Sequence, residues 1–340
     1  MANTNIKDIA EMAGVGISTV SRVINNHPDV SKETRKKVME IIEQKNYIPN
    51  NSARNLKRTD TKDIGVLVKG IFNPFFAKII QSIEEEVALQ GYTMILHYNN
   101  YHANDIEAAI EFVKEKRLKG LICLGGNFCN LNEEHFNALE APLVLASTDV
   151  EEKYKKELFS SVTIENERAA YEAVDYLCKL GHKNIGIITT GEEDLCVGNL
   201  RWKGYMKALK DHGVQYNPSY KEIGEYTFDS GFRALNQLIE RIPKLTAVFV
   251  TSDIMAIGAA KAALNRGLRI PEDLSIMGFD GIDYARFFHP SITTVNQPGE
   301  YMGKKSAGIL IDIIKKKKEH QHILLKTELL INDSCRELYE

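Results

Sequence analysis

The sequence predicts a small all-α module followed by a larger α/β body of two lobes with parallel sheets. Three observations lead to this prediction. Residues 1–58 carry apolar side chains at helical spacing and a net charge of +4, from ten Lys or Arg and six Asp or Glu. From residue 62 onward, short β-rich runs alternate with amphipathic helical segments. This alternation begins a second time near residue 161.

The first sixty residues have the pattern of three short helices. Small and branched apolar side chains recur at helical spacing on either side of Gly14, namely Ile6, Ile9, Ala10, Ala13, Val20, Val23 and Ile24. Ser31 is placed to cap a third helix that runs to about Lys45 and buries Val38, Ile41 and Ile42. Three such helices around a small core match a helix-turn-helix module.

In a helix-turn-helix module, the second helix enters the major groove of DNA with its first residues toward the base edges. Arg22 is suited to guanine, Ser18 to several bases and Ile17 to a thymine methyl group. Short polar side chains suited to phosphate oxygens are Thr19, Ser21, Asn25, Ser31 and Thr34. Residues 59–340 have a net charge of −7, so the charge split also favours polyanion binding by the N-terminal module. The alternative is a helical hairpin with a solvated polar surface.

The stretch IKDIAEMAGVGISTVSRVINNHPDVSKETRKKV, followed by YIPNNSAR-L, resembles the headpiece and hinge of the lactose and galactose repressor family. The match is dense over residues 5–58 and continues in weaker blocks to the C-terminus. Gly16 departs from the family, which usually has a serine there, a better helix cap than glycine. The resemblance implies a DNA-binding headpiece (1–48), a hinge helix and linker (49–61), and an effector-binding and dimerisation domain (62–340).

Residues 50–56 follow Pro49, which ends the preceding segment, and are enough for about two helical turns. Isolated helices shorter than about 12 residues are marginal in water, so this segment needs a partner. The resemblance implies that two hinge helices of a homodimer pair over the minor groove, where Leu56 wedges between base pairs. Packing of Leu56 on the adjoining domain is the alternative. The resemblance adds to the DNA-binding residues Tyr47, Asn50, Ala53 and Arg54.

The body is expected to contain two similar α/β halves with a ligand cleft between them. Its expected strands are DIGVLV, TMILHY, GLICLG and LVLAS in the first half, and SVTI, NIGIITT, AVFVTS and SIMGFD in the second. Helices are expected at Pro74–Gln90 and Asp105–Lys116. The family fold, which resembles periplasmic sugar-binding proteins, implies three crossings between lobes, with a first lobe of about 62–161 and 292–320 and a second of about 162–291 and 321–340.

Side chains that follow the expected strands are candidates for the cleft: Phe75, Phe76, Arg201, Trp202, Tyr226, Ser252, Asp253 and Asp280. An arginine and an aspartate beside aromatic rings suit a polyhydroxylated ligand, because charged groups hydrogen-bond hydroxyls and rings cover sugar C–H faces. In the family, the positions of Arg201 and Asp280 commonly hold the effector. Structural alternatives are an ion pair for Arg201, a helix cap for Asp253 and core packing for Phe75 or Tyr226. Leu195 and Val197 disfavour a purine.

Other classes of function find little support in the sequence. It lacks a G-x-S-x-G elbow, a P-loop, H-E-x-x-H and a G-x-G-x-x-G after a strand, so we expect no enzyme and no cofactor. The five cysteines are scattered (123, 129, 178, 196 and 335), and no metal site is expected. There is no run of 18 apolar residues and no secretory pattern in MANTNIKDIAE, so we expect a cytoplasmic protein without a membrane partner.

The leading hypothesis is a repressor that binds double-stranded, near-palindromic operator DNA as a homodimer. A small molecule in the cleft, most simply a carbohydrate, would control binding by preferring one arrangement of the lobes. One alternative keeps DNA binding and makes the body respond to a protein partner, as catabolite-control members of the family do. Another is a sugar-binding transport protein, which the headpiece opposes.

Overall fold

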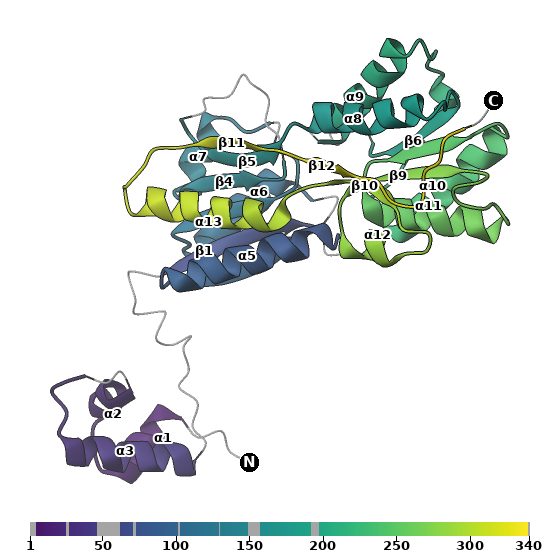
Figure 1. The fold of residues 1–340 in the computed structure, drawn as a ribbon. Helices are drawn as coiled ribbons and strands as arrows, with labels where there is room; N and C mark the ends of the chain where they lie inside the picture. The colour runs from purple at the N-terminus through teal and green to yellow at the C-terminus, as the bar shows by residue number, and fades with distance from the viewer. Residues whose placement is uncertain are drawn as a thin grey trace. The chain divides into compact units, whose positions relative to one another are not determined.

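The computed structural model describes residues 5–24, 27–45, 62–70, 73–100, 103–128, 130–148, 157–191 and 197–338 of the chain. The chain divides into two compact units, residues 1–61 and residues 62–340 (Figure 1). The first unit contains the short N-terminal helices, and the second is the α/β body.

Helices α1 (Ile6–Ala13), α2 (Ile17–Ile24) and α3 (Lys32–Gln44) make up the described part of the first unit. The side chain of Asn5 caps α1 by accepting hydrogen bonds from its first backbone amides. The helix ends at Gly14, whose φ of 65° lies in the left-handed region that glycine adopts without strain. The predicted glycine turn between the first two helices is therefore present.

The core of the first unit consists of six buried side chains from all three helices: Ile9, Ala10, Ala13, Val20, Val23 and Val38. Ile41 and Ile42 are partly buried against this core. The guanidinium of Arg35 ties α3 to the end of α2, because it donates hydrogen bonds to the carbonyls of His27 at 2.6 Å and of Val23 at 3.5 Å. The predicted three-helix arrangement is confirmed for the described residues.

Replacing Ile9 by alanine is expected to unfold the first unit while leaving the body folded. Ile9 is fully buried, and truncating a buried isoleucine costs about 2 to 5 kcal/mol. A module this small has little stability to lose. Circular dichroism melts should show an unchanged body transition for Ile9→Ala, and DNA binding should be abolished. Lys7→Ala, an exposed change in the same helix, is the control; DNA binding by Ile9→Ala equal to that of this control would contradict the prediction.

The body contains two separate sheets of mainly parallel strands, which define its two lobes (Figure 1). In the described residues, the first lobe's sheet has the order β11-β5-β4-β3-β1-β2 and the second lobe's sheet the order β12-β10-β9-β8-β6-β7. The strands are β1 (Asp63–Lys69), β2 (Thr93–Asn99), β3 (Gly120–Leu124), β4 (Leu143–Ala146), β5 (Ser160–Ile164), β6 (Ile185–Thr189), β7 (Lys221–Ile223), β8 (Ala247–Val250), β9 (Ser275–Asp280), β10 (Thr293–Asn296), β11 (His322–Leu325) and β12 (Glu328–Leu330).

Helices cover both faces of the first sheet. Two apolar layers lie on opposite faces of its alternating strands, one with α5 and α13 and the other with α6 and α7. In the second lobe α8 packs on α9, and α10 on α11 so closely that Gly231 and Gly258 have no room for a side chain. The helices are α5 (Phe75–Leu89), α6 (Asp105–Lys116), α7 (Glu133–Leu139), α8 (Asn166–Lys179), α9 (Val197–Asp211), α10 (Phe228–Arg241), α11 (Asp253–Asn265), α12 (Asp283–Phe287) and α13 (Gly299–Ile314).

The chain passes between the lobes three times within the described residues, and the crossings differ in position from those expected. The segment SVTI forms β5, which belongs to the first lobe's sheet rather than the second. Strand β10 pairs with β9 in the second lobe, so the return to the first lobe begins after Asn296 and not near residue 292. Strand β11 pairs with β5 in the first lobe, although residues 321–340 were assigned to the second. Backbone pairing decides which sheet each of these strands joins, and local composition does not reveal that pairing.

Candidate effector cleft and DNA-binding surface

Helix α2 exposes the side chains that the sequence analysis assigned to base contacts. Val20 and Val23 anchor its inner face in the core, which turns Ser18 and Arg22 toward solvent. Ile17 is 45% exposed at the start of the helix and is available to a partner surface. Thr19 and Ser21 are partly buried on the flanks of the same helix. This exposed end is the part of the module that a DNA groove can accept.

Ser31 and Thr34 meet at the start of α3. The Ser31 hydroxyl accepts a hydrogen bond from the Thr34 amide at 3.2 Å and donates one to Thr34 Oγ1 at 2.9 Å, so the predicted cap is present. Their assignment to phosphate contacts stays a prediction. Other residues assigned to DNA lie outside the described part of the chain: Asn25, Tyr47, Asn50, Ala53, Arg54 and Leu56.

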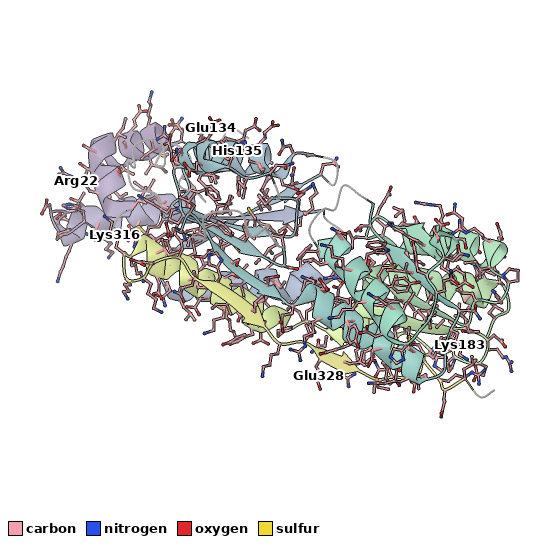
Figure 2. The ribbon with its side chains drawn as sticks, turned by 90° about the horizontal axis from the view of Figure 1, so that it is seen from above. Arg22, Glu134, His135, Lys183, Lys316 and Glu328 are labelled. Atoms are coloured by element: carbon pink, nitrogen blue, oxygen red, sulfur yellow. The ribbon has the colours of Figure 1, made fainter. Side chains whose placement is uncertain are left out.

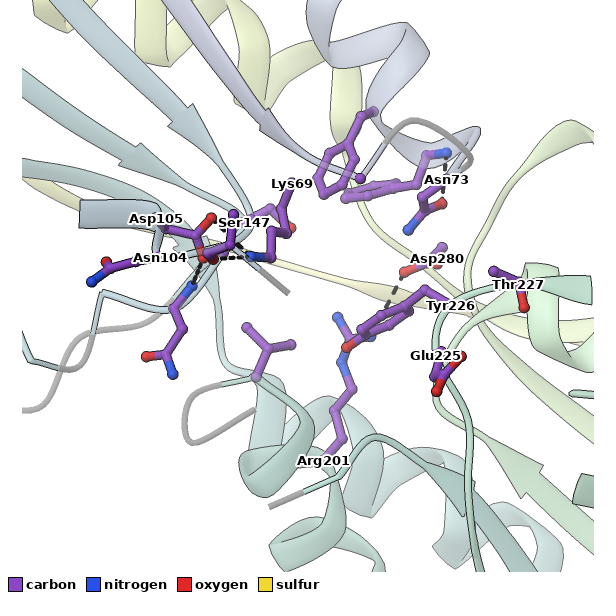
Figure 3. Close-up of a pocket in the computed structure, with 18 of the residues that line it drawn as sticks. Lys69, Asn73, Asn104, Asp105, Ser147, Arg201, Glu225, Tyr226, Thr227 and Asp280 are labelled. Carbon is purple, nitrogen blue, oxygen red and sulfur yellow. Dashed lines mark hydrogen bonds and ion pairs between the residues drawn. The ribbon is translucent and has the colours of Figure 1, made fainter. Parts of the chain in front are cut away.

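The body contains a cavity of about 570 Å³ lined by residues of both lobes. Figure 3 shows Lys69 and Asp105 on one side of it, and Arg201, Tyr226 and Asp280 on the other. Five of the eight predicted cleft residues line this cavity: Phe75, Phe76, Arg201, Tyr226 and Asp280. The structure does not bring Trp202, Ser252 or Asp253 to its wall.

Arg201 of α9 is 3% exposed and fixed on several sides. Its Nε donates to Asn166 Oδ1 at 3.0 Å, and its Nη1 donates to the Thr251 carbonyl at 2.6 Å. Its guanidinium lies 3.8 Å from the centre of the Phe279 ring. Nη1 is also 3.8 Å from Asp280 Oδ1. These contacts hold the planar donor group in one orientation at the cavity wall.

Asp280, at the end of β9, is 3% exposed and adopts a φ of 126°, a conformation strained for a residue with a side chain. Its Oδ1 accepts a hydrogen bond from Gln297 Nε2 at 2.8 Å. Its buried Oδ2 has no hydrogen-bond partner among the described residues. Burial raises the pKa of Asp280 to about 8, against the opposing effect of Arg201 and with a further rise from Asp253. The cavity wall therefore includes a buried carboxyl group with one oxygen that no described residue satisfies.

Asp253 supports Asp280 from the interior. Its Oδ2 accepts hydrogen bonds from the amides of Gly281 at 2.7 Å and Ile282 at 2.9 Å, and its Oδ1 accepts one from Thr294 at 2.6 Å. These bonds fix the loop that directly follows Asp280. Burial raises the pKa of Asp253 to about 6, while the hydrogen bonds act in the opposite direction.

The three predicted cleft residues that miss the cavity have local explanations. Ser252 is the N-cap of α11, where its hydroxyl accepts from the Met255 amide at 3.4 Å. Asp253 faces the interior and does not cap that helix. Trp202 lies against Tyr216, with ring centres 6.3 Å apart, because neighbouring positions of α9 point in different directions and Arg201 occupies the cavity side.

The first lobe contributes a polar cluster that the sequence analysis missed. Lys69 Nζ lies 3.0 Å from Asp105 Oδ1 and donates to the Ala103 carbonyl at 2.9 Å. Asn99 Nδ2 donates to the same Asp105 oxygen at 2.7 Å, and the Asn127 amide donates to Asp105 Oδ2 at 2.8 Å. The parallel register sets Lys69 opposite Asn99 at the carboxyl ends of β1 and β2. The signal for this cluster in the sequence was a polar residue at the end of each of two β-rich runs.

Replacing Asp280 by asparagine is expected to remove a loss of stability that develops as pH rises from about 4 to about 8. The folded chain holds the Asp280 proton up to about pH 8, whereas the ordinary aspartate value is 3.8. Its contribution to folding is therefore complete below the unfolded pKa and declines as pH rises through the folded pKa. Asp280→Asn, which resembles the protonated acid, should match the wild-type urea midpoint at low pH and exceed it increasingly toward about pH 9. Parallel pH profiles for the two proteins would contradict this.

No helix in the described part of the chain is long and apolar enough to cross a membrane. Among the same residues, no three His, Cys, Asp or Glu side chains are grouped so as to hold a metal ion.

Comparisons with known proteins match both units. The model for bacterial regulatory proteins of the lacI family matches residues 5–50, and the model for a periplasmic binding protein-like domain matches residues 174–335. The HTH-type transcriptional regulator MalR of Clostridium butyricum is 48% identical over 333 residues, 97% of this chain and 99% of that protein. The HTH-type transcriptional repressor CytR of Escherichia coli (strain K12) is 36% identical over 341 residues, 98% of this chain and 96% of that protein.

Two solved structures extend the likeness to the whole fold. A complex of the transcriptional regulator CelR with cellobiose has a TM-score of 0.73 and 29% identity, covering 97% of this chain and 99% of that one. The lac repressor dimer bound to operator and the anti-inducer ONPF has a TM-score of 0.77 and 26% identity, covering 98% and 100%. The chain belongs to the lacI family of bacterial regulatory proteins. It is a DNA-binding transcriptional regulator, and members of this family are not enzymes.

Proposed function

We propose that the protein binds operator DNA as a homodimer and that a carbohydrate in the cavity between its lobes controls this binding. The observation that carries the proposal is the buried pair of Arg201 and Asp280. Both residues line a cavity that aromatic rings also line. The rigid donors of Arg201 beside the polar carboxyl group of Asp280 on one wall suit hydroxyl groups. The rings of Phe75 and Phe76, 5.5 Å apart, offer apolar surface for C–H faces.

The charges around the cavity favour a neutral, hydroxyl-rich ligand over a strongly charged one. Its wall carries both signs of charge, since Lys69 and Arg201 are balanced by Asp105 and Glu225, while the raised pKa of Asp280 keeps that group protonated near neutral pH. A ligand with a large net charge would meet like charges at close range wherever it was placed. The cellobiose held by CelR supports the same ligand class.

Coupling to DNA follows from the position of the cavity between the lobes. A ligand that contacts both lobes stabilises the arrangement in which both sets of contacts are made. The lobes are also joined by an ion pair, in which Lys78 Nζ of α5 lies 2.9 Å from Asp283 Oδ1 of α12. The proposal extends to Leu56 as an apolar wedge in the minor groove at the operator centre. The lac repressor dimer bound to operator supports operator binding by a dimer.

The proposal is tested in two steps with the full-length chain. Selection from random duplexes should recover a near-palindromic operator, and calorimetry against a panel of sugars should give heat with at least one of them. The sugar that binds should change operator affinity. Heat with no sugar, while operator binding is intact, would reject the carbohydrate and favour control by a protein partner. Recovery of no preferred duplex would reject the DNA-binding part.

A further inference from the structure

One edge of the first lobe carries a concentration of positive charge that the cleft and the headpiece do not explain. We call this surface the basic edge, and it consists of Lys62, Lys116, Arg117, Lys119 and Lys315–Lys318. All of these residues except Lys119 are exposed. Residues 59–340 have a net charge of −7, so the charge of the basic edge is opposite in sign to the net charge of the body.

The fold itself brings these residues together. Strands β1 and β3 are parallel neighbours, so their first residues share one edge of the sheet, and the Lys119 amide donates to the Asp63 carbonyl at 2.8 Å. The end of α13 reaches the same edge, because the side chains of Leu310 and Ile314 lie directly over Gly120. Figure 1 shows β1 beginning where α13 ends.

Carboxylates neutralise only part of the basic edge. Lys116 Nζ lies 2.6 Å from Glu115, and Lys318 Nζ lies 2.9 Å from Asp312. Asp63 and Glu319 are the other acidic residues beside the lysines. Lys315 donates to Gln90 Oε1 at 2.8 Å and its ammonium lies 5.9 Å from the centre of the Tyr92 ring, so no carboxylate neutralises it among the described residues.

Lys316 and Lys317 form no ion pair with any described residue, and both are exposed in the turn that follows α13. Lys316 has a φ of 54°, which makes this turn sharp. Within the described residues, both ammonium groups therefore lack a carboxylate partner and are available to an external anion.

The basic edge is also the edge at which the chain arrives from the DNA-binding module, since β1 begins at Asp63. Sixteen residues separate α3 and its cap from Lys62, and such a segment spans at most about 55 Å. Because this segment links the headpiece covalently to Lys62, duplex DNA that the headpiece binds stays close to these lysines. DNA presents one negative charge per about 1.7 Å of its axis, so it is the polyanion with the highest effective concentration there.

We infer that the basic edge binds the phosphate backbone of the duplex on either side of the operator. This inference rests on the proposed function, because it requires operator binding by the headpiece. Phosphate contacts of this kind add affinity without reading sequence. The body then takes part in DNA binding directly, in addition to controlling it through the cleft.

The test compares two triple variants of the full-length chain that have the same change in charge. One removes charge from the basic edge by Lys62→Gln, Lys316→Asn and Lys317→Gln; asparagine suits the positive φ of Lys316. The control removes charge from exposed sites of the second lobe by Lys183→Asn, Lys203→Gln and Lys210→Gln. Figure 2 shows Lys183 and Lys316 at opposite ends of the body. All six sites are exposed, and circular dichroism confirms folding of both variants before binding is measured.

Affinity is measured over a range of salt concentrations for a duplex limited to the operator and for one with flanks of about 15 base pairs. Each lost phosphate contact makes the slope of log K against log salt less negative by about 0.9. On the flanked duplex, the basic-edge variant should lose up to about 2.7 of slope for each subunit that contacts a flank, and up to about 5.4 for both subunits of the homodimer. Between 50 and 200 mM salt, its loss of affinity relative to the wild type should therefore shrink by about 40-fold for each such subunit. The control variant should keep the wild-type slope, and the short duplex should show little difference.

Equal slopes for the wild type and the basic-edge variant would overturn the inference, as would an equal loss in the control variant. Either result leaves operator binding by the headpiece, and with it the proposed function, intact. A wild-type chain that binds no duplex would instead overturn the proposed function together with this inference.

Discussion

Replacing Arg22 by alanine is expected to weaken operator binding by about 5- to 150-fold for each half-site, because a bidentate contact to guanine is worth about 1 to 3 kcal/mol. Arg22 is exposed on α2, beside the exposed Ile17 and Ser18 and opposite the buried Val20 and Val23. The loss should be specific to sequence: the variant should lose discrimination at one base pair of each half-site and keep its affinity for unrelated DNA.

Lys36→Ala is the matched control for Arg22, since Lys36 is an exposed cation on α3 of the same unit. Its removal should leave discrimination between bases unchanged. Fluorescence anisotropy with the selected operator and with single-base variants measures both effects. An Arg22→Ala protein with wild-type affinity and wild-type discrimination would show that α2 does not read the bases.

Arg201→Lys is expected to lower the affinity for the cleft ligand by about 5- to 150-fold while leaving ligand-free operator binding intact. Lysine keeps the charge and loses the planar fork that reaches Asn166, the Thr251 carbonyl and the cavity at once. A buried polar group of the ligand that loses its arginine partner costs about 1 to 3 kcal/mol of binding free energy. The operator response to ligand should therefore shift to much higher ligand concentration.

The control for Arg201→Lys is Lys203→Arg, the reverse exchange at an exposed position of the same helix. Calorimetry with the ligand should distinguish the two variants, and urea unfolding should confirm that both are folded. Ligand affinity that is unchanged in Arg201→Lys would remove the arginine from the binding site and leave it a structural role.

Features coded by local spacing could be predicted from the sequence. The helices of the first unit follow the apolar spacing around Gly14 and the cap at Ser31. The expected helix Asp105–Lys116 agrees with α6 to the residue, because Asn104 caps its start and Arg117 ends it in the left-handed region. Arg201 and Asp280 could be found because each lies beyond the end of a β-rich run or at its last residue.

Features that depend on pairing between distant segments could not be predicted in the same way. Strands β5, β10 and β11 carry no local mark of the sheet they join, so the lobe boundaries were misplaced. The cluster of Lys69, Asn99 and Asp105 exists because the register of β1 and β2 sets Lys69 opposite Asn99, and Asp105 at the start of α6 contacts both side chains. Ser252 and Asp253 look like ligand residues after a strand, but a cap and a buried loop use their hydrogen bonds.

The central claim is that occupancy of the cleft and binding of the operator are energetically coupled. Linkage requires the coupling to be reciprocal: if the ligand changes operator affinity by a given factor, saturating operator must change ligand affinity by the same factor, typically about 5- to 150-fold. Calorimetric titration of the ligand into the full-length protein, alone and with operator, measures this factor directly. We expect two ligand affinities whose ratio equals the change in operator affinity, and identical affinities in the two titrations would contradict the claim.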